Sequence, residues 1–157
     1  MHVTLSKLTL AVLIAAGVSA CAGPSMAPEY KNSGKILPTT LPFSEAVQVG
    51  GLLLMSGQIG NLPGTLTLAS GGMPAEATQV MENIKTTLEA HGYSMNDVVK
   101  CTAMLADMKE WGAFNQVYEK YFQKGRYPAR SAFGTSGLAF NARVEVECIA
   151  AKSSPAT

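Results

Sequence analysis

The sequence predicts an α+β domain, a mixed β-sheet with two helices packed on one of its faces. Two observations lead to this fold class. The apolar pattern switches between the periods of strand and helix in the order β-β-α-β-α-β-β. The chain also has 157 residues, of which 47% are hydrophobic, and this suits one domain with its own core. No internal repeat is visible, so we place a single domain at residues 34–151.

The first elements are two strands within residues 45–60, joined by a tight turn. Gly50 and Gly51 stand between two apolar runs, a pattern typical of a hairpin. A short strand at Lys35 to Thr39 is a further option ahead of them. Residues 61–74 are interpreted as a loop because they are rich in glycine and proline.

The first helix is expected from Pro74 to His91. Its apolar residues recur at helical spacing: Ala77, Val80, Met81, Ile84 and Leu88. Pro74 suits the first helical turn, and Gly92 suits the C-terminal cap. His91 stands alone near the end of this helix, where a cation suits the helix dipole, and we favour that role over a catalytic one.

A third strand and a second helix come next. Residues 95–107 predict a strand with one apolar face, made of Val99, Cys101, Ala103 and Leu105. Asp107 can cap the following helix, whose aromatic stripe we assign to the core: Trp111, Phe114, Tyr118, Tyr121 and Phe122. Two last strands are expected at residues 129–134 and 142–151. With both helices on one face, the other face of the sheet is bare and partly apolar, which predicts self-association.

The leader predicts export and a lipid anchor. Residues 1–20 are interpreted as a signal peptide, because Lys7 precedes an apolar run that is too short to span a bilayer. The run ends in Val18-Ser19-Ala20-Cys21, which resembles a bacterial lipobox. Cys21 is therefore expected to be lipidated and to anchor the protein to a membrane, facing the periplasm. An ordinary signal peptide that yields a soluble periplasmic protein remains the alternative.

The domain is flanked by two segments for which no fold is predicted. Residues 21–33 hold the lipidated cysteine and a stretch rich in Pro, Ser, Ala and Gly, which we interpret as a flexible tether. Residues 152–157 are interpreted as a disordered tail.

Composition narrows the kinds of site that we expect. The formal net charge of +1 gives no sign of electrostatic capture of nucleic acid. The two histidines, His2 in the leader and His91, argue against a zinc cluster and a Ser-His-Asp triad, and no metal or cofactor is predicted. Cys101 and Cys148 lie in apolar runs, and export permits a disulfide, but we expect two buried free thiols.

Three charged residues in the last two strands are candidates for a site. Arg130 follows Pro128 in a strand-like run, and Glu145 and Glu147 alternate with valines. A buried charge is costly unless it is paired or used. A structural ion pair between Arg130 and Glu145 stays open, and for Glu147 we favour pairing with Arg143 or Lys100.

Four stretches resemble the RidA (YjgF/L-PSP) family, namely MSGQIG at 55–60, residues 97–122, YPARSAF at 127–133 and RVEVECIA at 143–150. The resemblance runs from about Gly34 to Ala151. It implies a chorismate-mutase-like homotrimer with clefts between subunits. It also implies hydrolysis of reactive 2-imino and enamino acids to 2-keto acids and ammonia.

The family's functional positions carry over one by one. The arginine that binds the substrate carboxylate falls on Arg130, and the glutamate that orients water falls on Glu145. The serine of the SGQ motif falls on Ser56, and the asparagine of the second helix falls on Asn115.

Two substrate-binding positions depart from the family pattern. Phe43 stands where a tyrosine is usual, and Ala132 stands where a cysteine is frequent. These changes put the substrate preference in question more than the class of reaction.

Three functions compete on these residues. The first is an exported imine hydrolase, in which Glu145 would hold a water and take its proton. The second is a family member that binds a small carboxylate without turnover. The third is an endoribonuclease, which the net charge and the lone His91 disfavour.

Overall fold

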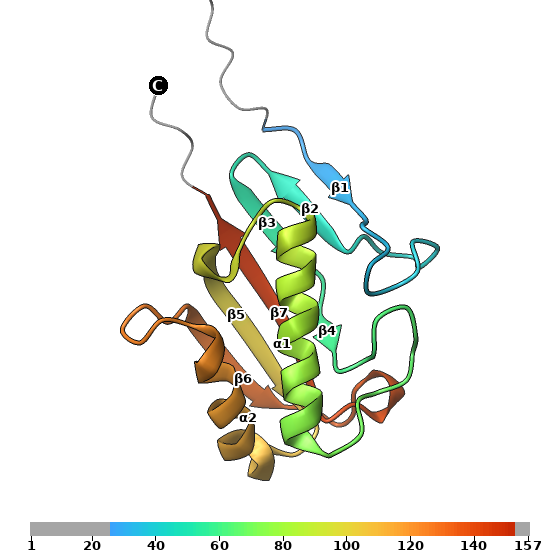
Figure 1. Ribbon diagram of the computed structural model, residues 1–157, viewed down its shortest axis with the longest axis vertical. Coiled ribbons are helices and arrows are strands. Elements are labelled where there is room, and N and C mark those ends of the chain that lie inside the picture. Colours follow the sequence, from blue (N-terminus) through green and yellow to red (C-terminus); the bar gives the residue numbers. More distant parts are fainter. Residues whose placement is uncertain (1–25, 153–157) are drawn as a thin grey trace, which may run out of the picture.

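A mixed sheet of seven strands forms the centre of the molecule, and two helices cover one of its faces (Figure 1). The computed structural model describes residues 26–152. The predicted signal peptide, Cys21, the first part of the tether and residues 153–157 of the tail lie outside the described residues. Within residues 26–152, no helix has both the length and the apolar character needed to cross a bilayer.

The elements follow the predicted alternation of strands and helices. The strands are β1 (Glu29–Lys31), β2 (Ala46–Val49), β3 (Leu52–Met55), β4 (Gln58–Ile59), β5 (Val98–Leu105), β6 (Ala129–Gly134) and β7 (Val144–Ala151). The helices are α1 (Met73–Ala90) and α2 (Trp111–Tyr118). Short 3₁₀ helices lie at Met95–Asp97, Met108–Glu110, Glu119–Tyr121 and Ala139–Asn141.

The strand order is β1-β2-β3-β7-β5-β6, and β4 pairs with β7. The β5–β6 pair is parallel and the remaining pairs are antiparallel, which makes the sheet mixed as predicted. α1 and α2 bury their apolar stripes on the same face of the sheet, against Leu53, Ala103 and Val146 among others. The predicted fold class is confirmed, and no helix of residues 26–152 covers the other face of the sheet.

The turns and caps that the sequence indicated are also present. Gly50 has φ +56° in the β2–β3 hairpin, and Gly92 has φ +79° just after α1. Both values lie in the left-handed region, which glycine adopts without the steric cost that a Cβ atom brings. Pro74 lies in the first turn of α1.

The sheet begins earlier than the sequence predicted, and its last strand ends at Ala151 as predicted. The expected tether contains β1, in which Tyr30 pairs with Val47 of β2, while residues 35–39 form no strand. The pairing of β1 with β2 satisfies backbone N–H and C=O groups along the edge of β2. The composition of residues 21–33 does not indicate this pairing, because it depends on a strand elsewhere in the chain. Lys152, predicted to begin the tail, donates its backbone N–H to the Gly51 carbonyl over 2.9 Å.

Two predicted core residues are instead exposed. Val99 is 46% exposed because a bulge between Val98 and Lys100 shifts the alternation of β5, so that Val98 takes the buried position. Trp111 is 42% exposed at the start of α2, whereas Phe114 and Tyr118 are buried. Asp107 caps the 3₁₀ turn that precedes α2, by accepting a hydrogen bond from the Lys109 backbone N–H over 2.9 Å.

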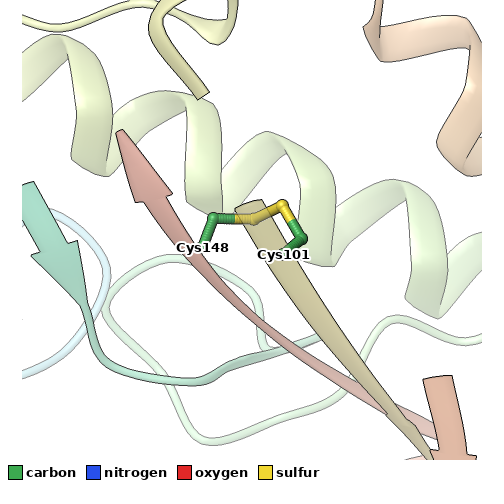
Figure 2. Close-up of a disulfide and its surroundings, with 2 residues drawn as sticks. All are labelled: Cys101 and Cys148. Atoms are coloured by element: carbon green, nitrogen blue, oxygen red, sulfur yellow. A yellow bond between two sulfur atoms is a disulfide. The ribbon is translucent and has the colours of Figure 1, made fainter. Parts of the chain in front are cut away.

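Cys101 and Cys148 form a disulfide, so the expectation of two free thiols is wrong (Figure 2). They are direct partners in the antiparallel β5–β7 pair, and their Cα atoms are 4.1 Å apart. Cross-strand partners on one face lie within bridging distance, but this register is known only once the sheet order is known. Both residues are buried beneath α1.

We expect the disulfide to stabilise the fold by about 2–4 kcal/mol, since it closes a loop with a sequence separation of 47. The double variant Cys101→Ala/Cys148→Ala should lose this amount in a urea titration. Reductant should lower the urea midpoint of unfolding of the natural protein, in which both sulfur atoms stay in the core after reduction. It should leave the midpoint of the double variant unchanged. Equal midpoints with and without reductant in the natural protein would contradict the stabilising role.

Candidate active site

Arg130 lies on the edge strand β6 and packs against two aromatic rings of α2. Its guanidinium carbon is 4.6 Å from the ring centroid of Tyr118 and 5.6 Å from that of Phe114. Such contacts stabilise a cation without using its N–H donors. No carboxylate of residues 26–152 forms an ion pair with Arg130, so the pair with Glu145 that the sequence left open is absent there.

A cavity of about 360 Å³ opens beside this arginine, and we call it the Arg130 cavity. It is lined by Asn115, Tyr118, Glu119, Tyr127, Pro128 and Arg130. The side-chain oxygens of Asn115 and Tyr118 are buried and have no hydrogen-bond partner in the described part of the chain, although buried polar groups normally have one. The Arg130 guanidinium makes the cavity suitable for a small ligand that carries a carboxylate.

Burial also fixes the protonation state of Tyr118. It raises the pKa of this phenol to about 12, although the charge of Arg130 acts in the opposite direction. The hydroxyl therefore keeps its proton at neutral pH. It remains a hydrogen-bond donor next to the guanidinium.

Glu145 lies on β7 in a second cavity, also of about 360 Å³, which we call the Glu145 cavity. It is lined by Leu37, Leu41, Phe43, Gly57, Ile59, Leu66, Ala139, Phe140 and Glu145. Burial raises the pKa of the Glu145 carboxyl, and the nearby charge of Glu147 raises it further. A carboxylate with a raised pKa is a better general base than an exposed one.

Glu147 does not form the ion pair that the sequence suggested. Arg143 instead pairs with Glu110 over 2.8 Å, and it lies 3.6 Å from Glu76. Lys100 donates to the hydroxyl of Ser131 over 2.9 Å. Glu147 is exposed, and its negative charge affects the site by raising the pKa of Glu145.

Gly57 packs directly against the Glu145 carboxylate. A Cβ atom at this position would lie 1.9 Å from Glu145 Oε1, far inside van der Waals contact. The absence of a side chain at residue 57 therefore determines where the carboxylate lies.

We expect Gly57→Ala to displace this carboxylate and to lower kcat by about 10²-fold, the usual cost of misplacing a reacting group by about 1 Å. Gly112→Ala is the matched control, because a Cβ atom at residue 112 meets nothing within 4 Å. It should keep full activity and, because alanine favours a helix more than glycine does, gain some thermal stability. Equal activity in the two variants would show that the position of Glu145 is unimportant.

The two cavities lie on opposite faces of the sheet. Arg130 is in register with Cys101, and Cys101 is in register with Cys148, so these three share the face that the helices cover. Glu145 is three residues from Cys148 on the same strand, and strand side chains alternate between faces. Glu145 therefore lies on the bare face, and one chain alone does not bring Arg130 and Glu145 together.

Comparison with known proteins identifies the family. The family described as Endoribonuclease L-PSP matches residues 34–152, most of the chain. The chain is a member of the RidA (YjgF/L-PSP) family.

Curated and solved relatives agree with this assignment. The chain is 44% identical over 109 residues to the 2-iminobutanoate/2-iminopropanoate deaminase of Mus musculus, covering 69% of this chain and 80% of the relative. It is 42% identical over 111 residues to a RutC family protein of Pyrococcus horikoshii, covering 71% and 87%. The crystal structure of RidA from an Antarctic Psychrobacter aligns with a TM-score of 0.71 and 36% identity, covering 78% and 98%. The expected RidA-type fold is thereby confirmed.

The other family positions divide between the two cavities and the structure around them. Asn115 lines the Arg130 cavity, and Phe43 lines the Glu145 cavity. Ser56 precedes Gly57 and donates its hydroxyl to the Ser44 carbonyl over 2.7 Å, so it holds the segment that carries Phe43. Ala132 lies on β6 on the same face as Arg130 and packs against the core.

Glu45 connects this same segment to the end of α1. Its carboxylate accepts hydrogen bonds from the backbone N–H and hydroxyl of Ser33, at 2.7 and 2.9 Å, and from the Thr87 hydroxyl at 3.0 Å. His91 Nε2 lies 3.0 Å from it. Burial acts to raise the pKa of Glu45, but these hydrogen bonds outweigh it and the net pKa is lowered. His91 therefore contacts a carboxylate that the sequence did not indicate, and its role as a cation at the helix dipole stays a prediction.

Several residues of these cavities were not assigned to a site from the sequence, among them Tyr118, Gly57 and Phe140. Tyr118 belongs to a core stripe and also lines the Arg130 cavity. Gly57 lies inside the SGQ motif, which was the one available signal for it. Phe140 gives no signal in the sequence, because its position depends on a backbone turn with positive φ. Among residues 26–152, no three His, Cys, Asp or Glu side chains gather as metal ligands.

Proposed function

We propose that this protein hydrolyses reactive 2-imino acids and their enamine tautomers to 2-keto acids and ammonia. The observation that carries the proposal is that one chain holds both a guanidinium, which has no acidic partner within residues 26–152, and a half-buried carboxylate of raised pKa. The guanidinium of Arg130 suits the carboxylate of an imino acid, and the carboxylate of Glu145 suits the activation of water. The names of curated relatives at 39–44% identity, 2-iminobutanoate/2-iminopropanoate deaminase, support the same reaction.

The chemistry needs little beyond placement of the reactants. Arg130 binds the substrate carboxylate through a bidentate pair of N–H donors. The imine carbon is already electrophilic, so a water oxygen adds to it while Glu145 takes the water proton. Glu145 returns this proton to the imine nitrogen, which gives a carbinolamine with one OH and one NH2 group. Glu145 then transfers the proton of this hydroxyl to the nitrogen. The C–N bond breaks, ammonia leaves, and the carbonyl of the 2-keto acid forms.

A site of this kind requires two chains, because Arg130 and Glu145 lie on opposite faces of one sheet. We propose a homotrimer, in which the Arg130 cavity of each chain meets the Glu145 cavity of the next. Such a contact joins two different surfaces, and contacts of that type close into rings. Exposed apolar side chains on the bare face, including Leu52, Leu54 and Phe133, support this assembly. Light scattering on residues 26–152 should give three times the mass of one chain.

Imine hydrolysis fits the site better than RNA cleavage or simple binding. RNA cleavage requires acid–base groups at a basic groove. His91 is instead engaged with Glu45 near the end of α1. A protein that only binds a carboxylate has no use for a half-buried glutamate whose pKa is raised.

The direct test follows ammonia and 2-keto acid release from freshly generated 2-imino acids. An amino-acid oxidase supplies the imine, and semicarbazide traps what remains of it. Added protein should accelerate imine decay and reduce the trapped product. An unchanged decay rate with every imino acid would overturn the proposal.

We also propose that the protein is exported and anchored through a lipid on Cys21. The lipobox-like stretch Val18 to Cys21 supports this, and so does the Cys101–Cys148 disulfide, since such bonds persist in oxidising compartments. Cys21→Ser should release the protein from the membrane fraction or leave it unprocessed. Unaltered fractionation of this variant would remove the case for lipidation.

A further inference from the structure

The walls of the Glu145 cavity are almost entirely apolar. Of the described residues, only Glu145 brings a charge to its lining, and six large apolar side chains surround it: Leu37, Leu41, Phe43, Ile59, Leu66 and Phe140. Cavities of about 300–1,000 Å³ accommodate whole small molecules, so about 360 Å³ exceeds what a methyl or ethyl group needs.

Phe140 is held in this wall by a strained turn. Its φ is +57° and that of Asn141 is +59°, two consecutive non-glycine residues in the left-handed region. For a bulky residue this conformation is a genuine outlier, and it persists only where the surrounding structure imposes it. Here the turn is closed by hydrogen bonds from the backbone N–H groups of Asn141 and Ala142 to the carbonyls of Leu138 and Ala139.

The strain does not serve the core, because the Phe140 side chain is 56% exposed. Phe43 and Leu66, on two other loops, are each 48% exposed and line the same cavity. The loops of Leu66 and Phe140 lie on the same side of β4 (Figure 1). Three loops thus present partly exposed apolar groups to one space, whose floor is formed by Glu145 and Gly57.

We infer that this site selects 2-imino acids with large apolar side chains, such as those derived from leucine, methionine and phenylalanine, and that Phe140 is the residue that sets this selectivity. The inference rests on the proposed function. The substrate carboxylate lies on Arg130 of one chain, and its side chain enters the Glu145 cavity of the next. This differs from the 2-iminopropanoate and 2-iminobutanoate in the names of the curated relatives, whose side chains are a methyl and an ethyl group.

The size of the effect follows from hydrophobic burial. Each methylene group moved from water into an apolar cavity improves binding about four-fold. A leucine-derived imino acid has three more carbons than the alanine-derived one. We therefore expect its kcat/KM to be higher by at least about ten-fold.

The experiment compares kcat/KM across imino acids generated from alanine, 2-aminobutyrate, leucine and phenylalanine. Phe140→Ala should lose about ten-fold on the leucine and phenylalanine substrates and change little on the alanine one. Trp111→Ala is the matched control, since Trp111 is also a large exposed aromatic but lies outside both cavities. It should keep the natural order of substrates.

Several results would overturn the inference. One is an equal or higher kcat/KM for the alanine-derived imine in the natural protein. Another is an equal loss on all four substrates in Phe140→Ala. A change of oligomeric state in that variant, measured by light scattering, would instead assign Phe140 to a contact between chains.

A second measurement separates this inference from the proposed reaction. The stable products pyruvate, 4-methyl-2-oxopentanoate and phenylpyruvate carry the same carboxylate and side chains. Calorimetry should show tighter binding of the two larger keto acids to the natural protein, and a loss of that difference in Phe140→Ala. Absence of turnover with this binding order intact would reject the hydrolase while supporting the apolar selectivity. Turnover without this binding order would support the hydrolase and reject the apolar selectivity.

Discussion

Glu145→Gln is expected to lower kcat by about 10²–10⁴-fold, the usual contribution of a positioned general base. Glutamine keeps the shape and hydrogen-bonding capacity of the side chain but does not accept a proton. The melting temperature, in contrast, should not fall. The raised pKa of Glu145 means that its ionised form is disfavoured by folding, so a neutral residue there should leave the melting temperature equal or higher at neutral pH.

The pH dependence gives a second signature of the same residue. Only ionised Glu145 acts as a base, so kcat/KM should fall as the pH drops through its pKa, which lies above the ordinary value of 4.5. Glu147→Gln is the matched control. Glu147→Gln removes a charge that raises the pKa of Glu145. The fall in kcat/KM should therefore occur at lower pH, while the maximal rate stays the same. A variant Glu145→Gln that retains its kcat, or one that melts lower, would indicate a structural role instead.

Arg130→Lys is expected to lower kcat/KM by about ten- to a hundred-fold. Lysine keeps the charge but lacks the planar fork, so one charge-assisted hydrogen bond worth about 1.5–3 kcal/mol is lost. The contacts with the Phe114 and Tyr118 rings also change, because the ammonium is a compact charge that stacks less well.

Arg126→Lys is the control for this substitution. Arg126 lies four residues earlier in the chain, is exposed, and lines neither cavity. It should keep both activity and stability. Comparison of turnover with melting temperature in the two variants separates lost substrate binding from lost folding. Full activity in Arg130→Lys would remove the residue that anchors the proposed substrate.

Much of the fold could be predicted because periodicity and turn chemistry are local. The α1 stripe from Ala77 to Leu88, the Gly50-Gly51 turn and the strand at 129–134 depend on residues near one another in the chain. The errors arise where non-local structure decides. The bulge at Val99 depends on the partner strand, and the pairing of Cys101 with Cys148 depends on the order of the sheet.

The candidate site shows the same division. Arg130 and Glu145 could be chosen from the sequence because a charge within an apolar strand needs a reason. Their placement on opposite faces could not, since it follows from the register of three strands. Phe140 could not be found either, because nothing in the local pattern indicates that an aromatic residue adopts positive φ.

The separation of Arg130 from Glu145 across one sheet has a genetic consequence. If each reaction centre takes its arginine from one polypeptide and its glutamate from a neighbour, two inactive alleles complement each other. Co-expressed Arg130→Ala and Glu145→Gln chains that mix at random rebuild an intact centre at about one site in four. Each centre of this kind joins a Glu145→Gln polypeptide, which supplies the arginine, to an Arg130→Ala polypeptide, which supplies the glutamate. Cells carrying both alleles then regain activity that neither allele provides alone.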